Sequence, residues 1–249
     1  MNIENYFNRI NYFDLINTDS HTLIKLHQHH IYSVPFENVD VYYKRLFTID
    51  VESVFNKVVE CNRGGFCYEL NLLFGQLLKN LGFPARIISA RIFDDFGTEG
   101  PDFDHMAIYV YAEKPFLADV GYGDLFIHPL EITEGDQFDG FSYFKLEQRS
   151  EEEYVLYKSD DGISYKLKYS FHTGPVSVDS FEKISLDKQV NPNSYFVKNL
   201  VCTKATKEGR ITILNNRLIE KKNNVKIEVN IENDDHLRSM LQLNFGIRI

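Results

Sequence analysis

The sequence has few cysteines, which limits the roles that they can play. Only three occur, Cys61, Cys67 and Cys202. Their number is odd and no two form a Cys-x-x-Cys pair, so the pattern indicates neither a disulfide framework nor a structural zinc site. We therefore expect free thiols in a reducing compartment, where one of them could act as a nucleophile.

Long hydrophobic runs and a targeting segment are also lacking. No stretch approaches the roughly 20 consecutive apolar residues of a membrane span. Residues 1–5 lack the basic and apolar blocks of a signal peptide. Hydrophobic residues make up 43% of the chain and charged residues 25%, which is typical of a globular protein. We expect a cytoplasmic protein that does not bind membranes.

Positive charge is scarce overall, because the net charge is −9. This argues against nucleic-acid binding, which needs positive charge to neutralise phosphates. The distribution is uneven, since residues 198–226 alone carry a net charge of +6. This basic segment could hold a small polyanion, or it could be the solvated face of a set of strands, and the sequence leaves both open.

Hydrophobic spacing divides the chain into three parts. The first 85 residues read as helical, and apolar residues from Leu70 to Leu81 share one face of a helix that Gly82 and Pro84 would end. From Ala85 the period changes to two, which predicts a barrel or sandwich of antiparallel strands. The expected strands lie at 86–93, 105–111, 115–120, 141–148, 153–157 and 164–169. After Phe181 the pattern is mixed, with strands expected at 210–214, 217–220 and 225–229 and a helix at 234–243.

Cys67 stands at the start of the predicted helix, directly after Arg63-Gly64-Gly65-Phe66. A thiol at a helix N-terminus lies at the positive end of the macrodipole, which stabilises a thiolate. Outward-pointing amides of the same turn could bind an oxyanion, and the two glycines would let the backbone approach a ligand closely. The alternative is a buried structural cysteine, which we expect for Cys61 and Cys202.

A nucleophilic cysteine requires a histidine as base and an acid that orients it. His105 begins an alternating strand, and Asp119 ends the next strand just before Val120-Gly121-Tyr122-Gly123. Asp119 could instead cap that glycine-containing loop. A simple hairpin pairs positions whose numbers sum to 227, which puts Asp119 and His105 on opposite faces of the sheet. The pairing therefore demands a bulge, an asymmetric loop, or a His105 outside the ladder. The run His27-Gln28-His29-His30 has no further ligand nearby, so we expect polar helix residues and no metal.

Four ordered motifs give the chain a resemblance to the arylamine N-acetyltransferase family. The family signature Arg-Gly-Gly-x-Cys-x-Glu-x-Asn matches residues 63–71, and its Pro-Phe-Glu-Asn segment matches residues 35–38. A His-Met-x-hydrophobic strand begins at His105, and Asp-Val-Gly-aromatic-Gly matches residues 119–123. Together the motifs span most of the chain, and their order makes coincidence far less probable than a single motif would.

The resemblance implies an α+β fold with a papain-like or transglutaminase-like Cys-His-Asp core. It implies a helical domain over 1–85, an antiparallel β-barrel domain over 86–186 and a small α/β lid domain over 187–249. The triad would be Cys67, His105 and Asp119, with acetyl-CoA acylating Cys67 and the acetyl group passing to an arylamine or arylhydrazine in a ping-pong scheme.

The resemblance also suggests binding residues. Phe36 and Tyr122 match positions that line the acceptor pocket, where phenylalanine is commoner than Tyr122 and the added hydroxyl is expected to alter acceptor preference. Gly123 and Phe196 match places near coenzyme A, while Arg63 and Glu69 would support the helix start or form a structural ion pair. The alternatives are a cysteine hydrolase or transglutaminase-like enzyme, an acyltransferase that uses a larger acyl group, and a catalytically silent binding protein.

Overall fold

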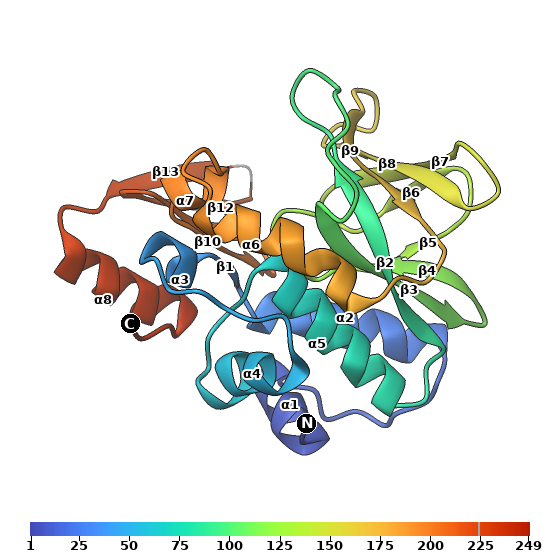
Figure 1. Ribbon diagram of the computed structural model, residues 1–249, viewed down its shortest axis with the longest axis horizontal. Helices are drawn as coiled ribbons and strands as arrows, with labels where there is room; N and C mark the ends of the chain where they lie inside the picture. The colour runs from blue at the N-terminus through green and yellow to red at the C-terminus, as the bar shows by residue number, and fades with distance from the viewer. Residues whose placement is uncertain (224) are drawn as a thin grey trace.

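The computed structural model describes residues 1–223 and 225–249, and it has the expected α+β fold. Figure 1 shows two antiparallel sheets with the N-terminal helices packed beside them. The helices are α1 (Ile3–Ile10), α2 (Ser20–Ser33), α3 (Val39–Tyr42), α4 (Val51–Phe55), a π-helical turn (Asn56–Glu60), α5 (Cys67–Asn80), a 3₁₀ turn (Val178–Phe181), α6 (Glu182–Val190), α7 (Tyr195–Lys198) and α8 (Asp234–Phe245).

The larger sheet has eight strands in the order β5-β4-β3-β2-β9-β8-β7-β6, and every pair is antiparallel. The side chain of Gln137 joins its two edge strands, with 2.8 Å hydrogen bonds to the backbone N–H and C=O of Glu131. The predicted barrel is thereby confirmed. Its strands are β2 (Ala85–Ile92), β3 (His105–Ala112), β4 (Lys114–Ala118), β5 (Leu130–Glu131), β6 (Asp136–Phe138), β7 (Tyr143–Gln148), β8 (Glu153–Ser159) and β9 (Lys166–His172).

Helix α5 covers the outer face of this barrel. Its apolar side chains share one core with Met106, Ile108 and Val110, the outward residues of β3. The alternate residues of the sheet, including Ala107 and Leu117, face a second core inside the barrel. The helix extends three residues further toward the N-terminus than the apolar spacing alone indicates, and it ends where predicted, with Gly82 at a φ of +90°.

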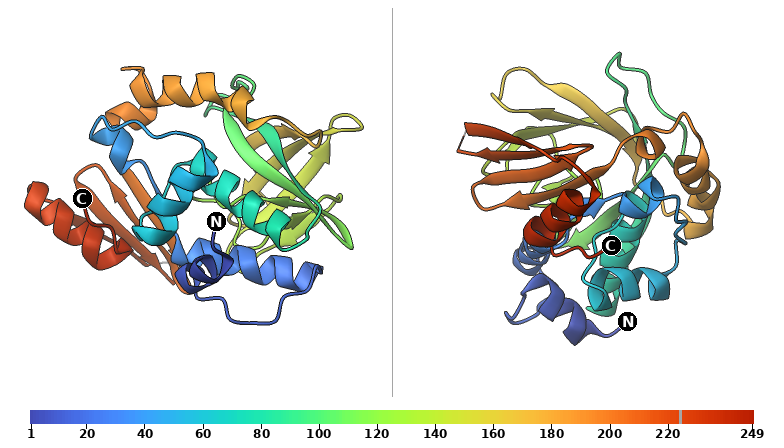
Figure 2. Two further views of the ribbon diagram at one scale, coloured as in Figure 1. Left: turned by 60° about the horizontal axis from the view of Figure 1, so that its bottom comes forward. Right: turned by 90° about the vertical axis from the view of Figure 1, so that its left-hand side faces the viewer.

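The smaller sheet has five strands in the order β1-β10-β11-β12-β13, and α8 packs on one face of it. Figure 2 shows this sheet and the barrel on opposite sides of the N-terminal helices. The strands are β1 (Phe36–Glu37), β10 (Val201–Thr206), β11 (Gly209–Leu214), β12 (Arg217–Lys222) and β13 (Val225–Asn230). Each predicted strand is present, with ends shifted by a few residues. The elements that were not predicted have short segments or lack a clear apolar period: strands β1, β5, β6 and β10 and helices α6 and α7.

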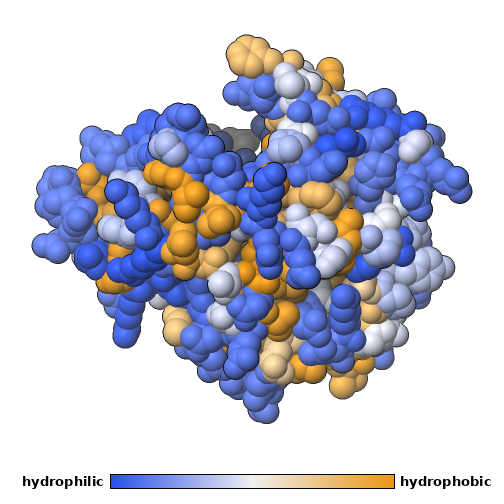
Figure 3. Space-filling view, in the orientation of Figure 1, coloured by the Kyte–Doolittle hydropathy of each residue, from blue (hydrophilic) through white to orange (hydrophobic). Residues whose placement is uncertain are grey.

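The proposed boundaries at 85/86 and 186/187 remain a prediction. Strand β1, from the helical part of the chain, adds to the smaller sheet through antiparallel pairing with β10. Among the described residues, every helix is too short or too polar to cross a lipid bilayer. Figure 3 shows a largely hydrophilic surface on the face seen in Figure 1, with hydrophobic atoms gathered around α3 and α7.

Candidate active site

Cys67 is the first residue of α5, as predicted from its position in the sequence. Phe66 precedes the helix in an extended conformation, and its backbone N–H donates to the Glu69 carboxylate at 2.8 Å. The Cys67 side chain is nearly buried, with 5% of its surface exposed. The N–H groups in the first turn of a helix have no carbonyl partner in that helix, so this turn also presents hydrogen-bond donors.

The two glycines before Cys67 bring the chain close to itself. A Cβ on Gly64 would lie 2.2 Å from the carbonyl oxygen of Pro35, so no other residue fits there without movement. Gly65 forms a parallel bridge with Phe36, and its carbonyl accepts from the backbone N–H of Glu37 at 2.9 Å. The close approach that we expected toward a ligand is therefore an approach to strand β1. It explains why two motifs that lie 28 residues apart meet at one place.

A network of buried and partly buried charges fixes this junction. Arg63 pairs with Glu37 at 2.7 Å and with Asp40 at 3.1 Å, while Lys57 pairs with Asp40 at 2.8 Å and with Glu69 at 2.9 Å. Arg63 and Glu69 are thus connected through Asp40 and Lys57 rather than paired with each other. Burial is the largest influence on Glu69 and raises the pKa of its carboxyl.

His105 and Asp119 form a buried pair. His105 Nε2 lies 2.7 Å from Asp119 Oδ2, and both side chains are at most 1% exposed. Burial by itself lowers the pKa of His105, but the charge and hydrogen bond of Asp119, together with the Cys67 thiol, raise it to about 10. Burial likewise raises the pKa of Asp119, and His105 more than offsets this, so the net shift is downward. The Nδ1 atom of His105 is left for the thiol. The structure thus brings Cys67, His105 and Asp119 together.

The hairpin between β3 and β4 solves the register problem. Its pairs, such as Ile108 with Ala118 and Ala112 with Lys114, sum to 226 rather than 227. A single residue, Glu113, forms the tip of the turn with a φ of +64°. The one-residue shift moves Asp119 to the face of the sheet that carries His105, because side chains alternate along a strand. The tight asymmetric turn meets the demand that the sequence posed.

Asn71 holds Asp119 and the backbone next to His105 and Asp119. It lies one helical turn after Cys67, and its Nδ2 donates to Asp119 Oδ1 at 2.9 Å and to the Met106 carbonyl at 2.6 Å. Its Oδ1 accepts from the backbone N–H of Val120 at 2.9 Å. A Cβ on Gly121 would lie 2.6 Å from Asn71 Nδ2, so glycine is needed for this close packing. The i+4 spacing from Cys67 was the available signal for this role.

Two further side chains contact Asp119 from distant parts of the chain. Tyr169 on β9 donates its hydroxyl to Asp119 Oδ2 at 3.0 Å. His27 on α2 accepts from the backbone N–H of Asp119 through Nε2 at 3.3 Å, and its Nδ1 lies 2.8 Å from the carbonyl of Ile127. Sequence reasoning missed both contacts, because no local pattern connects them to Asp119.

Two histidines of α2 lie in the core, although we expected only polar helix residues there. His27 and His30 are fully buried, and His30 Nδ1 is 2.8 Å from the hydroxyl of Tyr6. Burial lowers the pKa of His27 to about 4 and that of His30 well below its usual range. Among the described residues, no group of three or more His, Cys, Asp or Glu is arranged to hold a metal.

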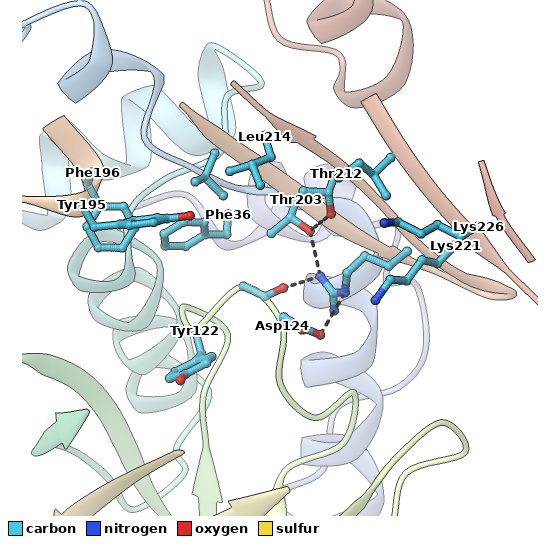
Figure 4. Close-up of a pocket in the computed structure, with 14 residues that line it drawn as sticks. Phe36, Tyr122, Asp124, Tyr195, Phe196, Thr203, Thr212, Leu214, Lys221 and Lys226 are labelled. Atoms are coloured by element: carbon cyan, nitrogen blue, oxygen red, sulfur yellow. Dashed lines mark hydrogen bonds and ion pairs between the residues drawn. The ribbon is translucent and has the colours of Figure 1, made fainter. Parts of the chain in front are cut away.

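The four residues expected to contact substrates all line one cavity of about 420 Å³ between the two sheets. Figure 4 shows Phe36 and Phe196 on one side of it and Lys221 and Lys226 on the other. The remaining lining residues are Tyr122, Gly123, Asp124, Tyr195, Val201, Thr203, Arg210, Thr212, Leu214 and Ile219. The triad lies behind the side of the cavity that Tyr122 and Phe36 form. The ring of Tyr122 is 5.5 Å from that of His105, and the ring of Phe36 is 5.6 Å from that of Phe66, the residue before Cys67.

One arginine connects the cavity wall to the loop after Asp119. Arg210 on β11 donates to the carbonyl of Gly123 and, at 3.2 Å, to the hydroxyl of Thr203. It also lies 3.4 Å from the Asp124 carboxylate, which pairs on its other side with Lys158 of the barrel. These contacts, drawn in part in Figure 4, hold the loop between the two sheets.

A buried thiol at a helix start, beside a histidine that is itself held by an aspartate, is the arrangement of enzymes that work through a nucleophilic cysteine. Comparison with known proteins narrows the class. The family model described as N-acetyltransferase matches residues 19–249. The chain is 30% identical to arylamine N-acetyltransferase, pineal gland isozyme NAT-10, of Gallus gallus, and the match covers the whole chain and 95% of the relative.

Solved structures agree. The arylamine N-acetyltransferase of Salmonella typhimurium superimposes with a TM-score of 0.91 at 25% identity, over 98% of this chain and 90% of that one. The Mycobacterium marinum enzyme, solved in complex with CoA, gives a TM-score of 0.88 at 25% identity over 99% and 93%. The chain belongs to the arylamine N-acetyltransferase family.

Proposed function

We propose that this acetyltransferase moves an acetyl group from acetyl-CoA to the nitrogen of an arylamine or arylhydrazine through a thioester on Cys67. The observation that carries the assignment of roles is the buried 2.7 Å pair of His105 and Asp119 beside the Cys67 thiol. Because the raised pKa of His105 keeps the imidazole protonated, the pair can hold the cysteine as a thiolate.

In the first half-reaction, Cys67 Sγ forms a bond to the acetyl carbonyl carbon. The bond between that carbon and the sulfur of CoA breaks, and the leaving sulfur takes the proton of His105. In the second, the amine nitrogen attacks the thioester, His105 removes a proton from that nitrogen, and the bond to Cys67 breaks. Asp119 orients the imidazole and stabilises its charge in both steps. The N–H groups of the first turn of α5, which lack a carbonyl partner within the helix, would stabilise the oxyanion.

The test is covalent loading of the enzyme. Incubation with acetyl-CoA should add about 42 Da to the intact protein, the mass of one acetyl group in place of a hydrogen. Cys67→Ala should gain nothing, whereas Cys61→Ala should load normally. The expectation that Cys61 is a buried structural cysteine is wrong, because it is an exposed thiol outside the site. Subsequent addition of an arylamine should remove the adduct and yield its acetamide. An enzyme that forms no adduct but cleaves peptides would be a cysteine hydrolase instead. Faster loading from a longer acyl-CoA would identify an acyltransferase for larger groups.

Substrates would reach the thiol through the cavity. Phe36 and Tyr122 lie next to the aromatic and imidazole rings around the triad, which supports an acceptor site there. Gly123 and Phe196 line the same cavity and support a place for the pantetheine end of CoA. Rates over a panel of arylamines and hydrazines, compared between the wild type and Tyr122→Phe, would measure how the hydroxyl shapes acceptor preference. Identical profiles would remove Tyr122 from the acceptor site.

The basic side chains of the smaller sheet support a site for the CoA phosphates. Arg210, Lys221 and Lys226 lie side by side on neighbouring strands and line the cavity. Arg210 is engaged with Asp124 and Gly123, so we assign the phosphates to Lys221. Lys221→Ala should raise the KM for acetyl-CoA, on the order of 10-fold for the loss of one charge-assisted hydrogen bond. It should leave the KM for a short acetyl thioester without phosphates unchanged, and an equal change for both donors would contradict the assignment.

A further inference from the structure

Strand β13 forms one free edge of the smaller sheet (Figure 1). Within the described residues it pairs with β12 alone, from Val225 opposite Lys222 to Asn230 opposite Arg217. Just after this ladder, the N–H of Ile231 donates to the carbonyl of Asn216 at 2.7 Å, so Ile231 faces β12. Backbone groups alternate along an antiparallel strand. The N–H and C=O groups of residues 226, 228 and 230 therefore point away from the sheet.

The side chains of β13 form an exposed apolar row. Val225, Ile227 and Val229 are 59%, 55% and 45% exposed, and they share the face of the sheet that α8 covers further in. Helix α8 buries Cys202 and Ile213 on the inner strands but stops short of β13. An exposed edge with an apolar face is a template for pairing with another strand, and proteins commonly protect such edges.

The charges on the other face of β13 are arranged as a self-complementary pair. The backbone N–H and C=O groups of Lys226 and Glu228 both point away from the sheet. Their side chains are 54% and 33% exposed. Lys226 also lies directly opposite Lys221 on β12, which places like charges side by side. A carboxylate on the free side of Lys226 would offset this repulsion. Glu228 contacts Lys226 along its own strand and Arg217 at 3.4 Å, both exposed pairs of little energetic weight.

We propose that β13 pairs with β13 of a second copy of this chain, in antiparallel orientation about a two-fold axis at Ile227. Only the outward-pointing residues of each copy can exchange backbone hydrogen bonds. Sliding the partner by two residues one way puts Lys226 opposite the partner's Lys226, and sliding it the other way puts Glu228 opposite the partner's Glu228. The central register places Lys226 opposite the partner's Glu228 twice.

The same register also matches the apolar face. Ile227 meets the partner's Ile227, and Val225 meets the partner's Val229 on each side. The two five-stranded sheets become one continuous sheet of ten strands, with the apolar rows of both copies joined. One strand pair makes a small interface, below the roughly 1,000 Å² of a stable complex, so the dimer forms at high protein concentration and dissociates on dilution.

Sedimentation velocity between about 10 and about 300 µM protein, at low salt, tests the pairing. The wild-type chain should pass from a 29.1 kDa monomer toward twice that mass as its concentration rises. Lys226→Glu places carboxylates opposite the partner's Glu228, and Glu228→Lys places two lysines together, so each single variant should stay monomeric. An equimolar mixture of the two should dimerise again, because every cross-strand pair in the mixed dimer then joins opposite charges. Circular dichroism and unfolding curves check that each variant is folded.

A variant on the opposite face separates the dimer from catalysis. Ile227→Asp puts two carboxylates at the two-fold axis and lies outside the cavity lining. It should abolish the dimer while leaving acetyl transfer unchanged. A wild-type chain that stays monomeric at about 300 µM would overturn the proposal. So would a Lys226→Glu variant that dimerises as well as the wild type, or a mixture of the two charge variants that does not associate.

Discussion

Strand β3 of the barrel and helix α2 each bury a histidine next to the same residue, Asp119, and the pKa values of the two histidines shift in opposite directions. His105 and His27 are both fully buried, and both contact Asp119. His105 contacts the carboxylate, and its pKa rises to about 10. His27 contacts only the backbone N–H, and burial lowers its pKa to about 4. Burial favours the neutral imidazole in both cases, so the position of the carboxylate decides which histidine can carry a proton at neutral pH.

The two histidines therefore have different roles around Asp119. The charged one lies between the thiol and the carboxylate, where a proton has to move. The neutral one accepts a hydrogen bond at Nε2, so its Nδ1 carries the hydrogen and donates to the carbonyl of Ile127. It thereby connects both ends of the 119–127 loop to α2. His27 is a positioning residue, since it has no contact with the reacting atoms.

Asp119→Asn should remove the difference between the two histidines and give the largest effect. The carboxylate accepts four hydrogen bonds: Oδ2 from His105 and Tyr169, and Oδ1 from Asn71 and the Gly121 N–H. An amide can accept at only one of its two ends, and it carries no charge. The pKa of His105 should then fall below its ordinary value, as that of His27 does, and the rate of Cys67 acetylation should drop on the order of 10⁴-fold.

Single-turnover loading with acetyl-CoA measures this rate, and NMR titration of the His105 ring measures the protonation. Tyr169→Phe is the matched control, because it removes one hydrogen bond to the same oxygen but keeps the charge. It should slow loading far less than Asp119→Asn does. Equal losses in the two variants would mean that hydrogen bonding rather than charge sets His105 apart. Because its pKa is raised, His105 in the folded protein keeps a proton that the unfolded chain releases above about pH 6.5. The stability that this proton adds is fully present below pH 6.5 and declines as the pH rises toward about 10.

The sequence predicted most of the arrangement around the charged His105 and little of the arrangement around the neutral His27. Cys67, His105 and Asp119 lie in local motifs, and apolar spacing places their helix and strands to within about three residues. The register of the β3–β4 hairpin could only be stated as a requirement, because a turn with one residue at positive φ, Glu113, leaves no distinctive composition. His27 meets Asp119 across 92 residues. Such contacts arise when whole elements pack, so neither periodicity nor spacing along the chain can indicate them.

The approach of the smaller sheet to the site was equally hidden. Gly64 and Gly65 were readable as a close approach, but their contact is with β1 rather than a ligand. The sequence showed that residues 198–226 are basic, but it did not show where in the fold this positive charge lies. Strand β10, which had no clear period, carries that segment against β1 and so places Arg210 and Lys221 at the cavity. The missed strand is the element that gives the basic segment its place.

His27→Leu should change stability and its pH dependence more than chemistry. The substitution leaves the Asp119 N–H and the Ile127 carbonyl without their partner, which costs about 1–3 kcal/mol at pH 7. Between pH 6.5 and about 4 the unfolded wild-type chain binds a proton at His27 that the folded chain excludes. Wild-type stability therefore falls as the pH is lowered through this window, by up to about 1.4 kcal/mol per pH unit from this residue. The variant lacks this loss, so the gap between the two proteins should narrow at acid pH.

Urea unfolding at steps from pH 7.5 to 4.5 follows the gap. Leu23→Ala is a suitable control, because Leu23 is a fully buried residue of the same helix that does not titrate. Its deficit should stay constant over the whole range. A gap between the wild type and His27→Leu that also stays constant would mean that His27 binds its proton equally well in the folded and the unfolded protein, so that burial does not lower its pKa. The contrast with His105 would then not hold, and below pH 6.5 a charged His27 would be expected to repel the charged His105.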